Sequence, residues 1–82
     1  LPGTMTALAA LWSGVLSTPV RSRDARFSEL GGNSLTMISL RMRIAAELGA
    51  DISAQQLHAH DDLEGMTTAV DAAPRVGSRA RR

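Results

Sequence analysis

The sequence contains no cysteine and only two aromatic residues, Trp12 and Phe27. Without cysteine there can be no disulfide framework and no thiolate metal site, and the protein has no thiol of its own to act as a nucleophile. β-Branched residues are sparse beside Ala, Leu, Met, Glu, Gln and Arg, so the composition favours helices over sheets. The fold class that we expect is therefore all-α.

Long apolar runs are also lacking, because no stretch approaches the roughly 20 residues that a helix needs to cross a bilayer. The first residues, Leu1-Pro2-Gly3-Thr4, have neither the basic nor the apolar stretch of a signal peptide. We therefore expect a cytoplasmic location and no membrane association. A chain of 82 residues can bury one hydrophobic core but not two, so we expect one domain, acting as a monomer.

The net charge of +1 hides a contrast between two parts of the chain. Four of the nine basic residues lie in residues 74–82, so residues 1–73 hold five arginines against eight acidic residues, a net charge of −3. Residues 74–82 show no apolar period and carry a high positive charge. We predict a folded, mildly acidic domain over residues 1–73 and a disordered basic tail over residues 74–82.

Apolar periodicity predicts four helices, of which the third is short. In the first, over about residues 4–16, one face carries Leu8, Leu11, Trp12 and Val15. Thr4 or Thr6 is the candidate N-cap of this helix. The second helix is expected over residues 34–48 and is closed by Gly49.

A loop of about 15 residues separates these two helices, and a loop of that length in a compact domain is expected to be pinned or functional. Phe27 and Leu30 are the residues that we expect to anchor this loop to the core. The third helical segment, over residues 52–57, has Ser53 as its candidate N-cap, and the fourth begins after Asp61 or Asp62 and runs to about residue 70. Together these elements predict a four-helix bundle.

The turn Gly31-Gly32-Asn33-Ser34 leads into the second helix. Its serine lies where unpaired backbone N–H groups and the positive end of the helix dipole favour a phosphate. The glycines permit a sharp turn and leave the hydroxyl without bulky neighbours. Taken alone, these four residues favour the simpler interpretation that the serine merely caps a helix.

The longer run Phe27-Ser28-Glu29-Leu30-Gly31-Gly32-Asn33-Ser34-Leu35 resembles the core motif of the peptidyl carrier (thiolation) domains of nonribosomal peptide synthetases. That motif reads Phe-x-Glu-Leu-Gly-Gly-(His/Asp/Asn)-Ser-Leu. The likeness extends to residues 8–16, to Leu40 and Arg43, and to the segment from Ile52 to Leu57. It departs from the family at residues 58–62, where the family usually has Phe and then Ala-Pro-Thr.

This resemblance implies a carrier, not an enzyme. Ser34 would receive 4′-phosphopantetheine from coenzyme A, and Gly32 and Asn33 would belong to the same site. The arm would hold an aminoacyl, peptidyl or aryl group as a thioester for nonribosomal peptide or related natural-product biosynthesis. The partners implied are a phosphopantetheinyl transferase, an adenylation (loading) enzyme, and condensation or tailoring enzymes. The thiol that the sequence lacks would then be supplied by the arm.

Two apolar stripes run along the second helix. Met37, Leu40, Ile44 and Leu48 form the expected core stripe. Leu35, Ile38, Met42 and Ala46 lie on roughly the opposite side. Because a surface helix needs only one apolar stripe, we expect the second to be partly exposed, with Leu35, Ile38 and Met42 binding partner enzymes.

Other functions fit less well. An acyl carrier protein of polyketide or fatty-acid synthesis shares the attachment chemistry but usually has Asp in place of Asn33. A small helical nucleic-acid-binding module would need a basic recognition helix, which the second helix does not provide. His58 and His60, with Asp61 and Asp62, lack a third spaced ligand, so we expect no metal site.

Overall fold

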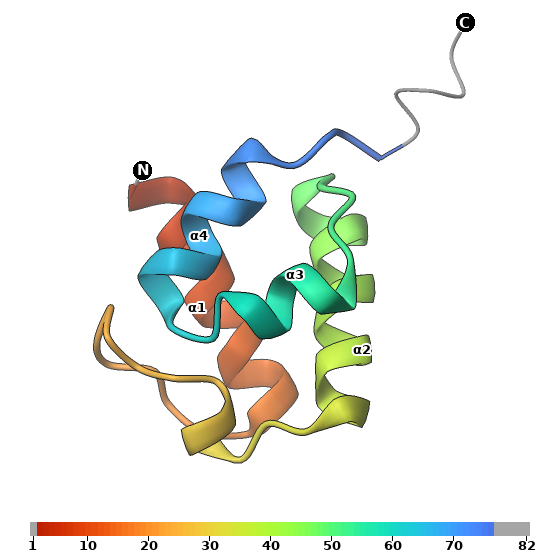
Figure 1. Ribbon diagram of the computed structural model, residues 1–82. Coiled ribbons are helices and arrows are strands. Elements are labelled where there is room, and N and C mark those ends of the chain that lie inside the picture. The colour runs from red at the N-terminus through yellow and green to blue at the C-terminus, as the bar shows by residue number, and fades with distance from the viewer. Residues whose placement is uncertain (1, 77–82) are drawn as a thin grey trace, which may run out of the picture.

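The helices expected from the apolar spacing are present in the computed structural model, which describes residues 2–76. The elements are α1 (Pro2–Leu16), a 3-10 helix η1 (Ser28–Leu30), α2 (Ser34–Arg43), a π-helix η2 (Ile44–Leu48), α3 (Ala54–Ala59) and α4 (Leu63–Ala72). Figure 1 shows α1 between α4 and α2, with the short α3 in front of the bundle. The prediction of an all-α, four-helix bundle with a short third helix and a long loop after the first is confirmed.

The core draws apolar side chains from all four helices and from the long loop. Trp12 and Phe27, both fully buried, meet edge to face with their ring centroids 5.2 Å apart. The indole N–H of Trp12 donates to the sulfur of Met66 on α4 at 3.3 Å. The other buried apolar residues are Leu8, Leu11, Met37, Leu40, Ile44, Ala50, Ile52, Leu57, Leu63, Met66 and Val70.

The start of α1 differs from the expectation. We predicted Thr4 or Thr6 as the N-cap, but the helix already begins at Pro2. A proline at the first helical position has a φ angle suited to the helix and lacks only an N–H that would have no helical acceptor. The hydroxyl of Thr4 instead donates to the Asp71 carboxylate at 2.8 Å, which joins the start of α1 to the end of α4.

The later helices begin close to the predicted places. The Ser53 side chain accepts from the Gln56 N–H, but α3 runs from Ala54 to Ala59, two residues later than predicted. This shift follows from the cap itself, because an N-cap residue precedes its helix. Of the two candidate caps of α4, Asp62 is the one used, and its side chain accepts from the Gly65 N–H at 2.9 Å.

The expected second helix is divided into α2 and η2. Arg43 and Ile44 keep right-handed helical backbone angles, so the chain continues in one direction while the hydrogen bonding changes to the wider π pattern. Gly49 ends the segment with a φ angle of 67°, in the left-handed region that favours glycine. The predicted stop at Gly49 is confirmed.

The chain after α4 remains attached to the bundle through Val76. Asp51 N–H donates to the carbonyl of Pro74 at 2.8 Å, and Val76 N–H donates to the carbonyl of Gly49 at 2.9 Å. The Arg75 guanidinium adds a hydrogen bond to the carbonyl of Leu48 at 2.9 Å. Residues 74–76 therefore differ from the disordered tail that we expected from residue 74, and residues 77–82 lie outside the described residues.

Within residues 2–76, no helix has both the length and the hydropathy needed to cross a membrane.

Candidate functional site at the start of α2

Asn33 and Thr36 form a reciprocal cap at the start of α2. The Asn33 side-chain oxygen accepts from the Thr36 N–H at 3.0 Å, and the Thr36 hydroxyl accepts from the Asn33 N–H at 2.7 Å. This arrangement satisfies two backbone donors that the first helical turn leaves without helical acceptors. Asn33 is thus the N-cap residue, and Ser34 is the first residue of α2.

The two glycines before Asn33 have different reasons to be glycine. Gly31 has a φ angle of 104°, which side-chain-bearing residues rarely adopt. Gly32 lies directly against Phe27: a Cβ at this position would overlap the Phe27 ring and lie 2.7 Å from its carbonyl oxygen. The Gly32 N–H donates to that same carbonyl at 2.9 Å. The turn is therefore fixed to the buried aromatic residue that precedes it.

Ser34 is exposed to solvent at the positive end of α2. The first turn contains no acidic side chain, while Arg41 and Arg43 lie in the last turn. Because no carboxylate offsets the positive end of the helix dipole, the position favours a negatively charged group such as a phosphate ester. An accessible hydroxyl, free N–H groups in the first turn and small preceding residues fit a phosphopantetheine ester.

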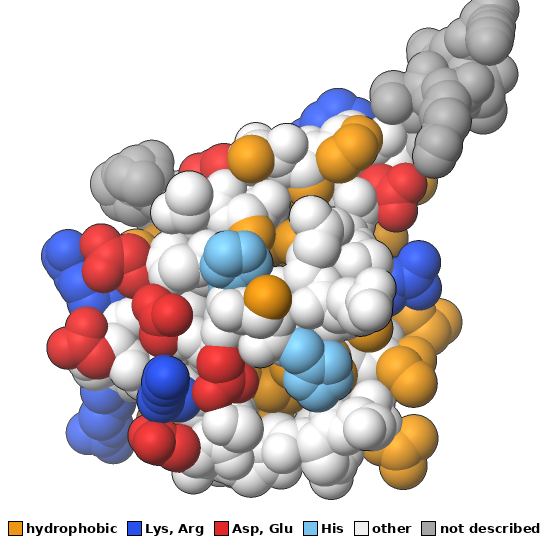
Figure 2. Space-filling model, viewed as in Figure 1, with side chains coloured by type: hydrophobic (Ala, Val, Ile, Leu, Met, Phe, Trp, Pro, Cys, Tyr) orange, Lys and Arg blue, Asp and Glu red, His pale blue; other side chains and the backbone are white. Residues whose placement is uncertain are grey.

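The structure keeps Gly32, Asn33 and Ser34 together where the chain enters α2, with Asn33 and Ser34 exposed, and places Leu35, Ile38 and Met42 along the outside of α2. The exposed fractions of these three apolar side chains are 75%, 49% and 63%. Figure 2 shows hydrophobic side chains gathered at the edge of the molecule where α2 lies, and charged side chains gathered at the opposite edge. The expected exposure of the second apolar stripe is therefore confirmed.

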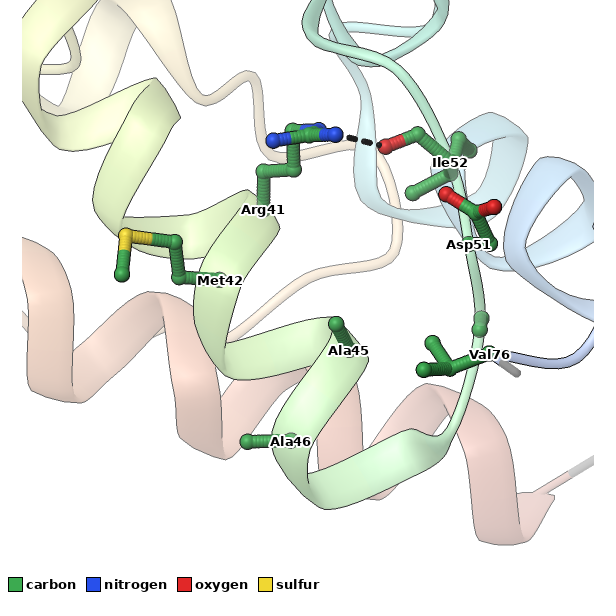
Figure 3. A pocket seen from close by; sticks show the side chains of 8 residues that line it. Arg41, Met42, Ala45, Ala46, Asp51, Ile52 and Val76 are labelled. Atoms are coloured by element: carbon green, nitrogen blue, oxygen red, sulfur yellow. Dashed lines mark hydrogen bonds between the residues drawn. The ribbon is translucent and has the colours of Figure 1, made fainter. Parts of the chain in front are cut away.

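An apolar groove of about 380 Å³ continues this stripe toward the end of η2 (Figure 3). Met42 and Ala46 contribute to one wall and Ile52 and Val76 to the other. The Nε–H of Arg41 donates to the carbonyl of Ile52 at 3.1 Å across the groove. Arg41 therefore lies along the edge of the core, as a long cationic side chain can, with part of its surface in solvent.

Sequence reasoning missed two side chains that support the turn. Thr36 follows the spacing of a capping box after Asn33, with threonine where glutamate or glutamine is usual, so a local signal was present. Asp61 gave no local signal, because it contacts Ser28, 33 positions away in the sequence. Such a contact becomes visible only when the loop and the α3–α4 junction are placed in space.

The polar residues before α4 do not gather into a metal-binding group. Asp61 accepts hydrogen bonds from the loop, and Asp62 caps α4. Among residues 2–76, no three His, Cys, Asp or Glu side chains lie close enough together to hold a metal ion.

The chain is similar to a known protein family and to parts of several larger proteins. Residues 6–70 match the family described as "Phosphopantetheine attachment site". The chain is 41% identical over 69 residues to a phenolphthiocerol/phthiocerol polyketide synthase of Mycobacterium tuberculosis. That alignment covers 84% of this chain but only 5% of the synthase polypeptide, so the chain spans a small part of this relative.

Two solved structures with the same fold come from nonribosomal peptide synthetases. One is a docking-domain complex of the Pax synthetase, with a TM-score of 0.77 and 35% identity over 84% of this chain and 66% of that one. The other is a nonribosomal peptidyl carrier protein (PCP) domain, with a TM-score of 0.73 and 30% identity over 89% of this chain and 90% of that one.

Proposed function

The chain belongs to the phosphopantetheine-attachment family, whose members carry a covalent 4′-phosphopantetheine, and on that premise we propose that Ser34 carries the arm in a peptidyl carrier domain. The observation that carries the assignment is the exposed Ser34 hydroxyl at the first position of α2. It is preceded by the Gly31-Gly32 turn and the Asn33 cap. We place Gly32 and Asn33 in the site because they set the position of Ser34.

The arm contributes a terminal thiol that holds an acyl group as a thioester. In the attachment step, Ser34 Oγ displaces adenosine 3′,5′-bisphosphate from coenzyme A, and the serine proton passes to a base of the transferase. The start of α2 would hold the resulting phosphodiester through the N–H groups of its first turn and the positive end of its dipole. The chain itself acts as a carrier and not as an enzyme, with the chemistry performed by partner proteins.

Those partners are a phosphopantetheinyl transferase, an adenylation enzyme, and condensation or tailoring enzymes. Their docking surface includes Leu35, Ile38 and Met42, which lie on the same helix as Ser34 and are between 49% and 75% exposed. The unbranched, flexible side chain of Met42 can adapt to several surfaces. A carrier that meets several enzymes in succession needs such adaptability.

The aminoacyl or peptidyl load is favoured over a simple acyl load by the Gly-Gly-Asn sequence before Ser34 and by the arginines at positions 41 and 43. The two solved structures named above also come from peptide synthetases. An acyl carrier of polyketide synthesis is the second candidate, supported by the 41% identity to a polyketide synthase.

The attachment site is tested by incubating the chain with coenzyme A and a promiscuous phosphopantetheinyl transferase. The wild type should gain the mass of one phosphopantetheine, and Ser34→Ala should gain none. Ser39→Ala is the matched control, because Ser39 is also an exposed serine of α2, and it should be modified like the wild type. Modification of the Ser34→Ala variant would contradict the assignment, as would an unmodified wild type.

The load is tested separately on the modified chain. Adenylating enzymes with amino acids should charge it, and acyltransferases with malonyl-coenzyme A should not. Charging by the acyltransferases alone would replace the peptidyl assignment with the polyketide one.

A further inference from the structure

The loop that leads to Ser34 is fastened along the junction between α3 and α4. Leu63 N–H donates to the carbonyl of Ala25 at 2.9 Å, and Glu64 N–H donates to the carbonyl of Arg23 at 3.0 Å. In Figure 1 the loop passes beside this junction before it turns toward the start of α2. The junction is therefore part of the support of the turn, although it lies far from Ser34 in the sequence.

Asp61 makes the closest contacts of this junction with the loop. Its carboxylate accepts from the Ser28 hydroxyl at 2.6 Å and from the Ser28 N–H at 3.1 Å. Its carbonyl accepts from the Phe27 N–H at 2.8 Å. A carboxylate that accepts two hydrogen bonds from one residue fixes that residue more firmly than neutral acceptors would.

The residues that Asp61 holds are those that determine the path to Ser34. The Phe27 carbonyl accepts from the N–H of Gly32, and the Ser28 carbonyl accepts from the N–H of Gly31 at 3.3 Å. Asn33 and Ser34 follow directly. Phe27 and Ser28 are thus each hydrogen-bonded to one of the two glycines. A displacement of Phe27 and Ser28 would therefore move Gly31 and Gly32, and with them the serine at the start of α2.

The neighbouring Asp62 has a different role, since its carboxylate caps α4 through the Gly65 N–H. Consecutive aspartates therefore serve separate elements: one begins a helix and the other holds a loop. The side chain of Asp61 makes its hydrogen bonds, among the described residues, to Ser28 and not to α4. A role in stabilising α4 does not account for its position.

We propose that Asp61 is a positioning residue for the reaction at Ser34, holding the Ser28–Gly32 turn in the arrangement that presents the serine hydroxyl to the modifying transferase. The proposal rests on the proposed function of Ser34. It assigns a role to the segment in which this sequence departs most from the peptidyl carrier pattern, residues 58–62.

The first test compares arm transfer to the wild type and to Asp61→Ala, at a temperature well below the melting of both. With the turn released, the hydroxyl spends less time in the reactive arrangement, and kcat/KM for transfer should fall about tenfold. Asp61→Asn should recover part of the loss, because an amide still offers one acceptor to Ser28. Glu64→Ala is the matched control. It removes one negative charge and an exposed ion pair with Arg23 of the loop at 3.8 Å, but leaves the Glu64 N–H bond to the Arg23 carbonyl. Because exposed ion pairs contribute little, its rate should stay within about twofold of wild type.

Amide hydrogen exchange separates positioning from general stability. In Asp61→Ala the Gly32 N–H, which Asp61 does not contact, should exchange faster, whereas the Leu40 N–H in the middle of α2 should exchange as in the wild type. A purely structural role would instead lower the melting temperature and leave the transfer rate of the folded protein unchanged.

Transfer to Asp61→Ala at the wild-type rate would overturn the inference while leaving Ser34 as the attachment site. An unmodified wild type would overturn the proposed function itself. Should Asp61→Ala fail to fold, Ser28→Ala decides, because it loses the hydroxyl bond but keeps the N–H bond to Asp61. It should be slowed about threefold; an unchanged rate with unchanged Gly32 exchange would overturn the inference.

Discussion

The two apolar stripes of α2 and η2 contain similar side chains and have opposite environments. Leu40 and Ile44 are fully buried and Met37 is 2% exposed, whereas Leu35, Ile38 and Met42 are between 49% and 75% exposed. The stripes therefore differ in their neighbours and not in residue type: the first faces α1 and α3, and the second faces solvent. Hydrophobicity alone does not say which stripe packs in the core and which stays exposed.

The largest effect is expected from a polar substitution in the buried stripe. Leu40→Ser removes a buried side chain and leaves a hydroxyl without a partner in the core. Large-to-small core substitutions cost about 2–5 kcal/mol, and an unsatisfied buried polar group adds about 1–3 kcal/mol. Because a small domain has about 5–15 kcal/mol in total, we expect unfolding or a severe loss of stability, measured by thermal and urea melting. A variant that melts like the wild type would contradict the core assignment.

An intermediate effect, on binding but not on folding, is expected from the exposed stripe. Ile38→Ser and Met42→Ser should each change the free energy of unfolding by less than about 0.5 kcal/mol. Loss of an apolar anchor from a small interface costs about 1 kcal/mol or more, so kcat/KM for arm transfer should fall about fivefold. Melting curves and transfer rates are measured on the same samples. If these variants unfold as Leu40→Ser does, the exposed stripe is core and the comparison fails.

The smallest effect is expected between the two stripes. Ser39 is exposed, and alanine is a better helix former than serine. Ser39→Ala should therefore raise the free energy of unfolding by about 0.3 kcal/mol. The transfer rate should stay within about twofold of wild type. A large fall in transfer would extend the docking surface beyond the exposed stripe.

The sequence was informative wherever a structural rule is local. Helical periodicity located the core stripe of α2, and residue type and position identified the cap Ser53 and the stop Gly49. For α4 they narrowed the cap to Asp61 or Asp62, of which the structure uses Asp62. The start of α1 was missed because a threonine was preferred as the N-cap over a proline within the first turn. The division of α2 from η2 was also missed, since a π-helix has no clear residue signature.

Contacts between distant segments could not be derived from the pattern. The pairing of Pro74–Val76 with Gly49–Asp51 depends on where α4 ends relative to η2. The bond from Ser28 to Asp61 depends on the path of the loop over the α3–α4 junction. The motif around Ser34 could be identified from the sequence, but the contact of the loop with Asp61 could not.

The attachment of Pro74–Val76 to the segment after η2 sets the geometry of the whole carrier. Ser34 begins α2, whereas Val76 lies beside Gly49, just beyond the far end of η2 (Figure 1). Fifteen helical residues separate these two ends, a span of about 20 Å. With the arm attached at Ser34 as proposed, the attachment point and the segment Pro74–Val76 would lie at opposite ends of the α2–η2 helical segment. An enzyme that closes over Ser34 would therefore approach the end of the α2–η2 helical segment that lies away from Pro74–Val76.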